Sequence, residues 1–321
     1  MAEHARPDEC VIALDVGGTG MKGALVDRRS GVLLTERRRT PRAAGPEAVV
    51  DAVTAALRSL AGQAADLGLT VRQAGVVVPG IVDAERAVAV YAANLGWRDL
   101  PLAALLEERT GLPVTLGHDV RAGGLAEVRL GAARGARDAL FVAIGTGISA
   151  AIVHDGRLLT AGGYAGELGH LVVEPDGRPC PCGARGCLET IASAAGIAAA
   201  YSARTGRPVH GAAEVAALLA EGDEAALAVW QRAVHGLATA LTTAVTLLAP
   251  EVVVLGGGLA ESAGLLLDPL RAGLDRRLTF HRRPRLVAAA LGDEAGCLGA
   301  GLHAWDTVDR VGTALGAPGR H

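Results

Sequence analysis

The sequence predicts an α/β fold built from a duplicated unit. Residues 11–31 and 140–159 share one plan, in which an apolar strand, a turn containing G-T-G, a second apolar strand and a polar turn follow one another. Further apolar runs that end in glycine turns alternate with longer stretches of helical periodicity. Internal similarity of this kind indicates duplication. We therefore expect two α/β halves, each presenting a glycine turn to the same ligand.

Composition favours a protein with a large core over a nucleic-acid-binding or membrane protein. Half of the 321 residues are hydrophobic and only 2% are aromatic, so the core must consist mainly of Ala, Val and Leu. A formal net charge of −3 argues against a nucleic-acid partner, which usually requires a basic patch. No apolar run approaches the length of about 20 residues that spans a bilayer, and the N-terminus does not resemble an export signal. We expect a soluble, cytoplasmic protein in a reducing compartment.

The turn of the first hairpin is suited to binding phosphate. The run VIAL predicts a buried strand that ends at Asp15, and ALVD predicts a second strand after the turn VGGTGMK. Glycines let backbone N–H groups approach an anion, and nearby side chains add a hydroxyl, an ammonium and a carboxylate able to hold hydrated magnesium. An ordinary hairpin turn is the alternative. The candidate residues are Asp15, Gly17, Gly18, Thr19 and Lys22.

Lys22 is the only lysine among 31 basic residues, which suggests that this turn requires a compact ammonium. Gly18, Gly20 and Gly23 also satisfy the dinucleotide motif G-x-G-x-x-G, but that motif requires a helix after the glycines. Here the polar turn DRRSG follows within a few positions, so we predict a strand instead and reject a Rossmann interpretation. A Walker A loop fails as well, because Gly23 stands where that motif has Ser or Thr.

The middle of the first half contains further elements. Residues 46–66 follow a helical pattern, and AGVVVPGIVD predicts a strand that stops at Pro79 and Gly80. A loop is expected to hold Asn94, the only asparagine of the chain, and Trp97.

A candidate acid or base follows in Asp119. A helix is predicted around residues 101–110, and PVTLGHD predicts a strand that ends at Asp119. The segment RAGGLAEVRLG after it is expected to be helical, so Asp119 would lie exposed between the strand's carboxyl end and the helix N-terminus. A helix cap is the alternative role for this aspartate.

The second half begins with the second hairpin, whose turn forms a second candidate phosphate loop from Gly145, Thr146 and Gly147. Residues 190–249 are expected to be largely helical, and Pro250 ends the last of these helices. A final helix is predicted near residues 293–305, followed by a mobile polar tail.

The run VVVLGGG predicts a buried strand that leads into three glycines, after which ESAGLLLDPL begins a helix. Glycines at this junction allow close approach of a flat ring or a phosphate, with a plain turn as the alternative. The candidate residues are Gly256, Gly257 and Gly258.

The stretch from Gly166 to Glu189, GELGHLVVEPDGRPCPCGARGCLE, contains a candidate metal site with three of the chain's five cysteines. Three thiolates and one imidazole complete a tetrahedral set for zinc, and a set without a vacant position is normally structural. A disulfide is the alternative, but a single residue separates the first two cysteines, which is too close for an unstrained bridge. The candidate ligands are His170, Cys180, Cys182 and Cys187, and the flanking Glu167 and Glu189 suggest that the loop shapes a pocket.

Taken in order, these motifs resemble those of the ROK family, which comprises bacterial glucokinases, other sugar kinases and sugar-responsive repressors. The resemblance rests on DVGGTGMK, VPGIVD, NLGW, HDVRAGGLAE, AIGTGISA, ELGH to CPCGARGCLE, and VVVLGGG, and covers roughly residues 10–305. It implies the duplicated actin-like, hexokinase-like (ribonuclease H-like) ATPase fold, with two α/β domains around a cleft that holds ATP and sugar. It also implies assembly as homodimers or homotetramers.

The resemblance implies a small domain of residues 10–117 plus about 293–312. A large domain of residues 118–292 would carry the zinc-binding loop, and flexible tails would occupy residues 1–9 and 313–321.

Carried over residue by residue, the resemblance makes Asp119 the general base for the sugar hydroxyl. The first turn then corresponds to the first phosphate motif, the second turn to the second, and the three glycines to the adenosine-side motif. Family members use the histidine equivalent to His170 both as a zinc ligand and as a neighbour of the sugar. The implied sugar contacts are Gly80, Asn94, Asp119, Glu167, His170 and Glu189.

We therefore expect an ATP-dependent hexose kinase that uses Mg²⁺ and carries structural Zn²⁺, with glucose at its 6-hydroxyl as the first candidate substrate. N-acetylmannosamine, N-acetylglucosamine, fructose or allose could replace glucose, and polyphosphate could replace ATP. His118 stands where the family usually has asparagine, which leaves the sugar open. A sensor of the repressor lineage is the alternative from another class. Repressors carry an N-terminal helix-turn-helix of several tens of residues, and about ten precede the first phosphate motif here, so we expect no nucleic-acid binding.

Overall fold

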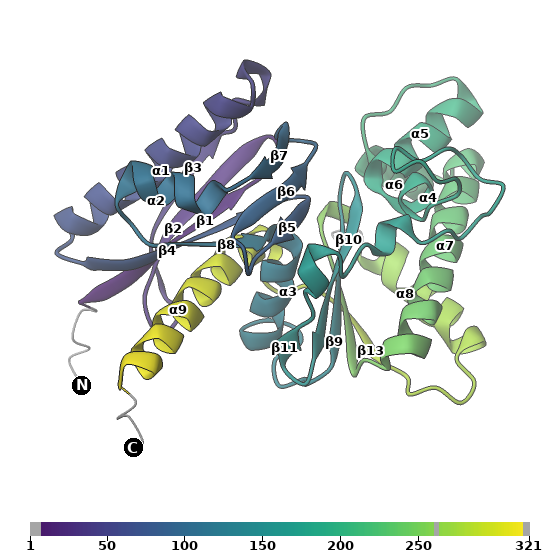
Figure 1. Ribbon diagram of the computed structural model, residues 1–321. Helices are drawn as coiled ribbons and strands as arrows, with labels where there is room; N and C mark the ends of the chain where they lie inside the picture. Colours follow the sequence, from purple (N-terminus) through teal and green to yellow (C-terminus); the bar gives the residue numbers. More distant parts are fainter. Residues whose placement is uncertain (1–7, 260–262, 317–321) are drawn as a thin grey trace. The chain divides into compact units, whose positions relative to one another are not determined.

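The computed structural model describes residues 8–259 and 263–316, which form two compact units (Figure 1). Unit 1 comprises the described residues up to Ala126, together with Thr160–Tyr164 and those from Glu294 onward. Unit 2 comprises the described residues of Glu127–Leu159 and Ala165–Asp293.

Unit 1 is organised around a five-stranded sheet of order β3-β2-β1-β4-β8. β1, β2 and β3 form an antiparallel meander, whereas β4 and β8 run parallel to β1. The predicted first hairpin is therefore present, and a strand rather than a helix follows its glycine turn, which confirms that the G-x-G-x-x-G match is not a dinucleotide motif. The strands are β1 (Glu9–Val16), β2 (Gly20–Val26), β3 (Val32–Arg39), β4 (Thr70–Val78) and β8 (Val114–His118).

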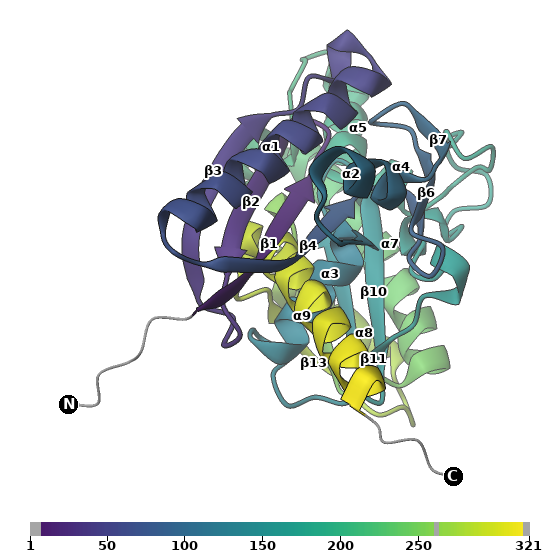
Figure 2. The same cartoon turned by 60° about the vertical axis from the view of Figure 1, so that its left-hand side comes forward.

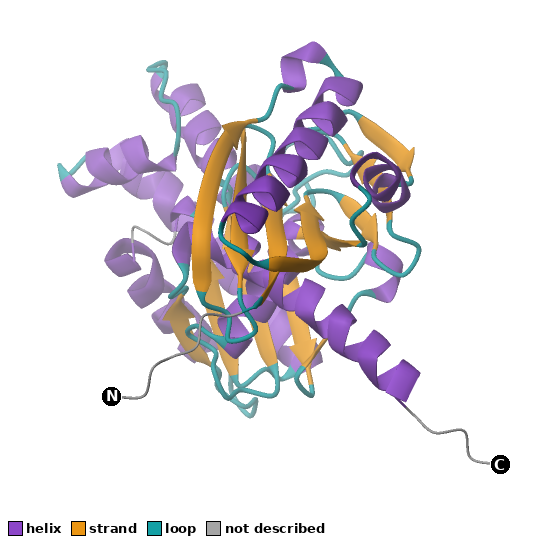
Figure 3. Cartoon of the chain, turned by 90° about the vertical axis from the view of Figure 1, so that its left-hand side faces the viewer, coloured by secondary structure: helices purple, strands orange, loops and turns teal. Residues whose placement is uncertain are grey.

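Helices cover both faces of this sheet. Successive side chains of a strand point to opposite faces, so Ile12 and Leu14 pack with α1 (Pro46–Asp66) and α2 (Leu102–Thr110) in one buried cluster. Val11 and Ala13 pack instead with α9 (Ala295–Gly316) in another cluster. α1 and α9 accordingly lie on opposite sides of the strands in Figures 1 and 2, and Figure 3 views α1 lying across them.

A second, smaller sheet of unit 1 was not expected from the sequence. It has the order β5-β6-β7, formed by β5 (Ile81–Asp83), β6 (Val88–Ala92) and β7 (Trp97–Leu100). The prediction that Trp97 lies in a loop is wrong, because Trp97 begins β7 and its indole N–H donates to the Pro46 carbonyl over 3.1 Å. Asn94 lies in the turn between β6 and β7.

Unit 2 repeats the topology of the first sheet in the order β11-β10-β9-β12-β13. β9, β10 and β11 again form an antiparallel meander, and β12 and β13 again run parallel to β9. The duplication predicted from the two hairpins is therefore confirmed. The strands are β9 (Ala139–Ile144), β10 (Ile148–His154), β11 (Arg157–Leu158), β12 (Val252–Gly256) and β13 (Arg285–Ala288).

The helices of unit 2 pack with its sheet in one large buried cluster of mainly Leu, Val and Ala. As predicted, a long helix ends just before Pro250, and Asp223 caps its start by accepting the Ala226 N–H over 2.8 Å. The helices are α4 (Glu189–Ala192), α5 (Ala194–Thr205), α6 (Ala212–Ala220), α7 (Glu224–Leu248) and α8 (Ala263–Arg277).

The chain ends differ from expectation. α9 continues to Gly316 instead of stopping near Trp305, and Glu9 belongs to β1 rather than to a flexible leader. The remaining parts of the predicted tails, residues 1–7 and 317–321, lie outside the described residues, as do residues 261–262 of the predicted helix start before α8. No helix within the described ranges combines the length and apolar character needed to cross a membrane.

Candidate functional site

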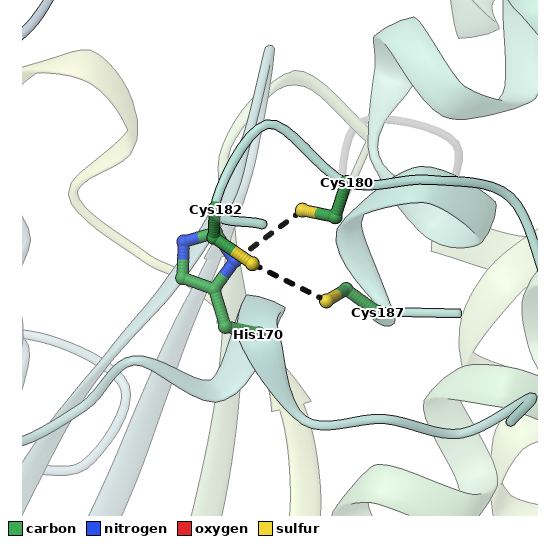
Figure 4. Close-up of side chains that lie close together, drawn as sticks. All are labelled: His170, Cys180, Cys182 and Cys187. Atoms are coloured by element: carbon green, nitrogen blue, oxygen red, sulfur yellow. Dashed lines mark hydrogen bonds between the residues drawn. The ribbon is translucent and has the colours of Figure 1, made fainter. Parts of the chain in front are cut away.

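The predicted metal ligands converge in unit 2 (Figure 4). His170 ends the short 3₁₀ helix η3 (Leu168–His170), and the cysteines come from the loop that follows it. The Cys180 sulfur lies 3.7 Å from Nδ1 of His170, and the Cys182 and Cys187 sulfurs lie 3.7 Å apart. All four donor atoms lie within 4.8 Å of one another.

These distances fit a tetrahedral zinc site. Zn–S bonds of about 2.3 Å place two thiolates about 3.8 Å apart around a tetrahedral ion. The cysteines are not bonded to each other, since the S–S bond of a disulfide is about 2.05 Å. Burial raises the pKa of the Cys187 thiol to about 12. Three cysteines and one histidine at these distances form a donor set that suits zinc.

The cysteine loop is held in shape by backbone contacts. The Cys180 N–H donates to the Ala184 carbonyl over 2.8 Å, and Val172 pairs with Cys187 in an isolated antiparallel bridge. Gly186 has a φ of 71°, and a Cβ there would lie 1.5 Å from the Glu174 carbonyl oxygen. Only glycine fits this position, so the loop geometry is built into the sequence.

The stretch that carries Glu167 and His170 is fixed to β10. The Ala150 N–H donates to the Gly166 carbonyl over 2.7 Å, and Gly166 has a φ of 96° with no room for a Cβ against the Ala150 carbonyl. The Nδ1 of His170 faces Cys180, whereas its Nε2 lies 4.0 Å from Oε2 of Glu167. The imidazole can thus ligate zinc through Nδ1 and point its other nitrogen toward a carboxylate.

Glu189 lies against the second glycine turn. Its Oε2 accepts the Ile148 N–H over 2.9 Å and occupies the place that a Cβ of Gly147 would need, at 2.5 Å. The Gly145 carbonyl in turn accepts the Ala194 N–H over 2.9 Å. Glu189, the first residue of α4, therefore supports the turn of Gly145, Thr146 and Gly147. The sequence had suggested Glu189 as a sugar contact.

The third glycine segment lies beside this turn, because β12 pairs with β9 in parallel and both strands end at the same edge. Gly257 has a φ of 82°, and a Cβ there would lie 2.4 Å from the Ile144 carbonyl oxygen. Gly256 ends β12 and packs against the ring of Phe141. Unit 2 thus places Gly256, Gly257 and Gly258 next to the second candidate phosphate loop.

Asp119 is the first residue of α3 (Asp119–Arg129) in unit 1, directly after β8, as predicted. Its side chain is 27% exposed, and Oδ1 accepts the Val120 N–H over 2.6 Å. A capping side chain would instead bind an N–H two or three residues further on. The Arg121 N–H lies 3.4 Å from Nδ1 of His118, so His118 occupies that role.

His118 is buried, and its Nδ1 lies 3.3 Å from Oδ1 of Asp119. Burial lowers the pKa of His118 below 6.5, although the neighbouring Asp119 opposes this shift. A neutral imidazole is also the form that accepts the Arg121 N–H through Nδ1. His118 therefore adds no positive charge beside the carboxylate at neutral pH.

The lowered pKa of His118 predicts a stability that falls toward acid. The unfolded chain binds a proton near pH 6.5, where folded His118 stays neutral, so the free energy of unfolding decreases as pH falls through that value. Replacing His118 by Gln should flatten this acid-side slope by at most about 1.4 kcal/mol per pH unit. Urea unfolding at pH 7 and 5.5 measures the slope. The exposed His210→Gln is the control, and an equal flattening in both variants would contradict the assignment.

Arg121 is a buried residue near this site that the sequence did not single out. Its guanidinium donates to the carbonyl oxygens of Gly163, over 3.0 Å, and Val82, over 3.1 Å. The two bonds tie α3 to β5 and to the segment Ala161–Gly163. Gly80, with a φ of 99°, packs on the Tyr91 carbonyl of β6 and fixes the other end of β5.

The first glycine turn is closed by its own backbone. The Gly17 N–H donates to the Gly20 carbonyl over 2.9 Å, and the Thr40 hydroxyl donates to the Gly17 carbonyl over 2.6 Å. A Cβ on Gly18 would lie 3.5 Å from Cβ of Asn94, so Asn94 lies next to the turn. The Thr19 carbonyl accepts the Thr40 N–H over 3.2 Å, which joins the turn to the end of β3.

The two charged residues of this turn lie opposite each other in the sheet, Asp15 on β1 and Lys22 on β2. The ammonium of Lys22 contacts Glu294 over 3.1 Å. Sequence analysis missed Glu294, because it comes from the far end of the chain. The only local signal was its position at the start of the final predicted helix, near residues 293–305.

The chain is similar to known proteins in both sequence and fold. The model of the ROK family matches residues 11–306. The chain is 30% identical to a glucokinase of Streptomyces coelicolor, covering 90% of this chain and 95% of the relative. It is 35% identical to an N-acetylmannosamine kinase of Citrobacter koseri, covering 91% and 97%. The crystal structure of a ROK family glucokinase from Streptomyces griseus in complex with glucose and AMPPNP superimposes with a TM-score of 0.77 at 30% identity, covering 92% of this chain and 99% of that one.

Proposed function

The chain belongs to the ROK family, and from this premise we propose that it is a sugar kinase that transfers a phosphoryl group from ATP to a hexose, with glucose at its 6-hydroxyl as the substrate. The relatives named glucokinase and the neighbour solved with glucose and AMPPNP support ATP and hexose as the substrate pair. The duplicated fold supports the same assignment.

The observation that carries the proposal is the setting of Asp119. Phosphoryl transfer to a hydroxyl needs a base that accepts the hydroxyl proton. Asp119 lies partly exposed at the start of α3, with one oxygen oriented by the Val120 N–H. Neutral His118 leaves the carboxylate without a neighbouring cation from that side. We assign Asp119 as the general base.

We assign the glycine segments to the donor. In unit 1 the turn of Gly17, Gly18 and Thr19 would offer the N–H groups of Gly18 and Thr19 to phosphate oxygens, while the Gly17 N–H closes the turn and Lys22 adds charge. In unit 2 the segments Gly145–Gly147 and Gly256–Gly258 lie side by side and would serve the second phosphate motif and the adenosine. Magnesium, when bound, would neutralise charge on the phosphates, and Asp15 is the carboxylate we assign to its hydration shell.

We assign the sugar to carboxylates and amides that accept or donate hydrogen bonds with its hydroxyls. Asn94 and Asp119 belong to unit 1, and Glu167, His170 and Glu189 belong to unit 2. Zinc, when bound, would fix the ring of His170 and the loop around it without joining the chemistry, because its four ligands leave no open position. Gly80 shapes the backbone before β5.

A panel assay tests the proposal. Sugar-dependent ADP release is measured with glucose, N-acetylmannosamine, N-acetylglucosamine, fructose and allose, and formation of sugar phosphate is measured with polyphosphate as donor. We expect the highest kcat/KM with glucose and ATP. A higher kcat/KM with N-acetylmannosamine would change the proposed substrate but leave the proposed reaction, phosphoryl transfer to a sugar, in place. Sugar binding without ADP release in any combination would overturn the kinase assignment in favour of a sensor.

A further inference from the structure

Lys22 belongs to a row of charged side chains that crosses three strands of unit 1. It lies directly opposite Asp15 on β1 and Arg37 on β3. Residues opposite each other in an antiparallel pair project to the same face. In β2 this is the face of Ala24 and Val26, which pack with α9. The row therefore points toward the N-terminal end of α9.

Glu294 meets this row from the other side. It ends the short 3₁₀ helix η5 (Gly292–Glu294), immediately before α9. Its Oε1 lies 3.1 Å from Nζ of Lys22 and 3.4 Å from Nη2 of Arg37. The side chain of Lys22 is only 9% exposed, whereas those of Glu294 and Arg37 are 40% and 64% exposed. One carboxylate oxygen thus serves a buried ammonium and an exposed guanidinium.

The first turn of α9 also accommodates Asp15. A Cβ on Gly296 would lie 2.3 Å from Oδ2 of Asp15, so the carboxylate occupies the space that the missing side chain leaves. A carboxylate at a helix N-terminus is favourably placed with respect to the helix dipole. The residues around the start of α9 therefore contact both charged members of the first glycine turn.

We propose that Glu294 is a positioning residue that holds the Lys22 ammonium for the phosphoryl donor. The inference rests on the proposed kinase function and adds to it a residue that acts on the donor through Lys22. A lysine stem has several rotatable bonds, and a charge-assisted hydrogen bond fixes the otherwise mobile end. An ammonium has three N–H donors, so a bond to Glu294 is compatible with a bond to a phosphate oxygen.

The test is a double-mutant cycle on Glu294 and Lys22, read by steady-state kinetics with ATP and the best sugar. Glu294→Gln keeps the shape of the side chain but removes its charge. We expect kcat/KM for ATP to fall about 10- to 100-fold, as for loss of a hydrogen bond to a charged group, with an unchanged sugar KM. Glu294→Asp should restore part of the loss. In a Lys22→Met background, Glu294→Gln should have little further effect, because positioning acts through Lys22.

Glu47→Gln is the matched control, because Glu47 also pairs with an arginine in unit 1, but on the exposed surface of α1. It should leave all constants unchanged. Wild-type kinetics for Glu294→Gln, a sugar KM that rises with the ATP effect, or equal losses with and without Lys22 would each overturn the inference alone. A wild-type protein that released no ADP with any sugar would overturn the proposed function and the inference together.

Discussion

Replacing Asp119 by Asn should lower kcat for sugar-dependent ADP release by about 10²- to 10⁴-fold, the usual contribution of a general base. Asn has nearly the same shape, and its side-chain oxygen can still accept the Val120 N–H that Oδ1 of Asp119 accepts now. The start of α3 should therefore be preserved, while the side chain can no longer take a proton. The measurement is a coupled ADP assay at saturating ATP and sugar.

The control for this variant is Asp51→Asn, because Asp51 is an exposed aspartate of α1 in the same unit whose carboxylate pairs with Arg109. It should keep wild-type kcat. Sugar affinity of Asp119→Asn, measured by calorimetry, should change far less than kcat, since the base acts mainly in the transition state. If Asp119→Asn kept more than about a third of the wild-type kcat, Asp119 would not be the base.

The parts of the fold that follow from local sequence were predictable. The glycine turns, the strand that follows the first of them and the duplicated topology are set by apolar runs next to Gly17 and Gly145, where neighbours in sequence decide the structure. The convergence of the four metal ligands followed from cysteine spacing for the same reason. α9 was predicted too short because the small and polar residues after Trp305 were interpreted as a tail. Val308, Val311 and Leu315 keep a helical spacing there, and the helix continues to Gly316.

Contacts between distant segments were not predictable. Lys22 and Glu294 are 272 residues apart in the chain, and neither residue has a local pattern that names the other. The bond from Arg121 to Gly163 similarly depends on a segment that enters unit 1 from elsewhere in the sequence. The sequence suggested the ammonium of Lys22, the only lysine, as a phosphate ligand. The tertiary structure adds the carboxylate of Glu294 beside it. Such partners explain how a buried charge is tolerated.

The Cys182→Ser variant should lose zinc and raise the sugar KM about tenfold or more, while nucleotide binding stays close to wild type. Cys182 is the exposed cysteine of the cluster, so a serine there leaves no buried hydroxyl without a partner. Its loss removes one of four ligands, and the ring of His170 is then no longer held from the Nδ1 side. The sugar KM should change because His170 and Glu167, which we propose as sugar contacts, belong to the same stretch fixed to β10.

Elemental analysis should find about one zinc per wild-type chain and much less in Cys182→Ser. Cys10→Ala is the control, because Cys10 is a buried thiol of β1 outside the cluster, and this variant should keep its zinc. Sugar and AMPPNP titrations then separate the two substrates. A wild-type protein that is fully active without metal would refute the zinc assignment. A zinc-free variant with a normal sugar KM would show that the metal only stabilises the loop. It would also show that zinc is not needed to position Glu167 for the sugar.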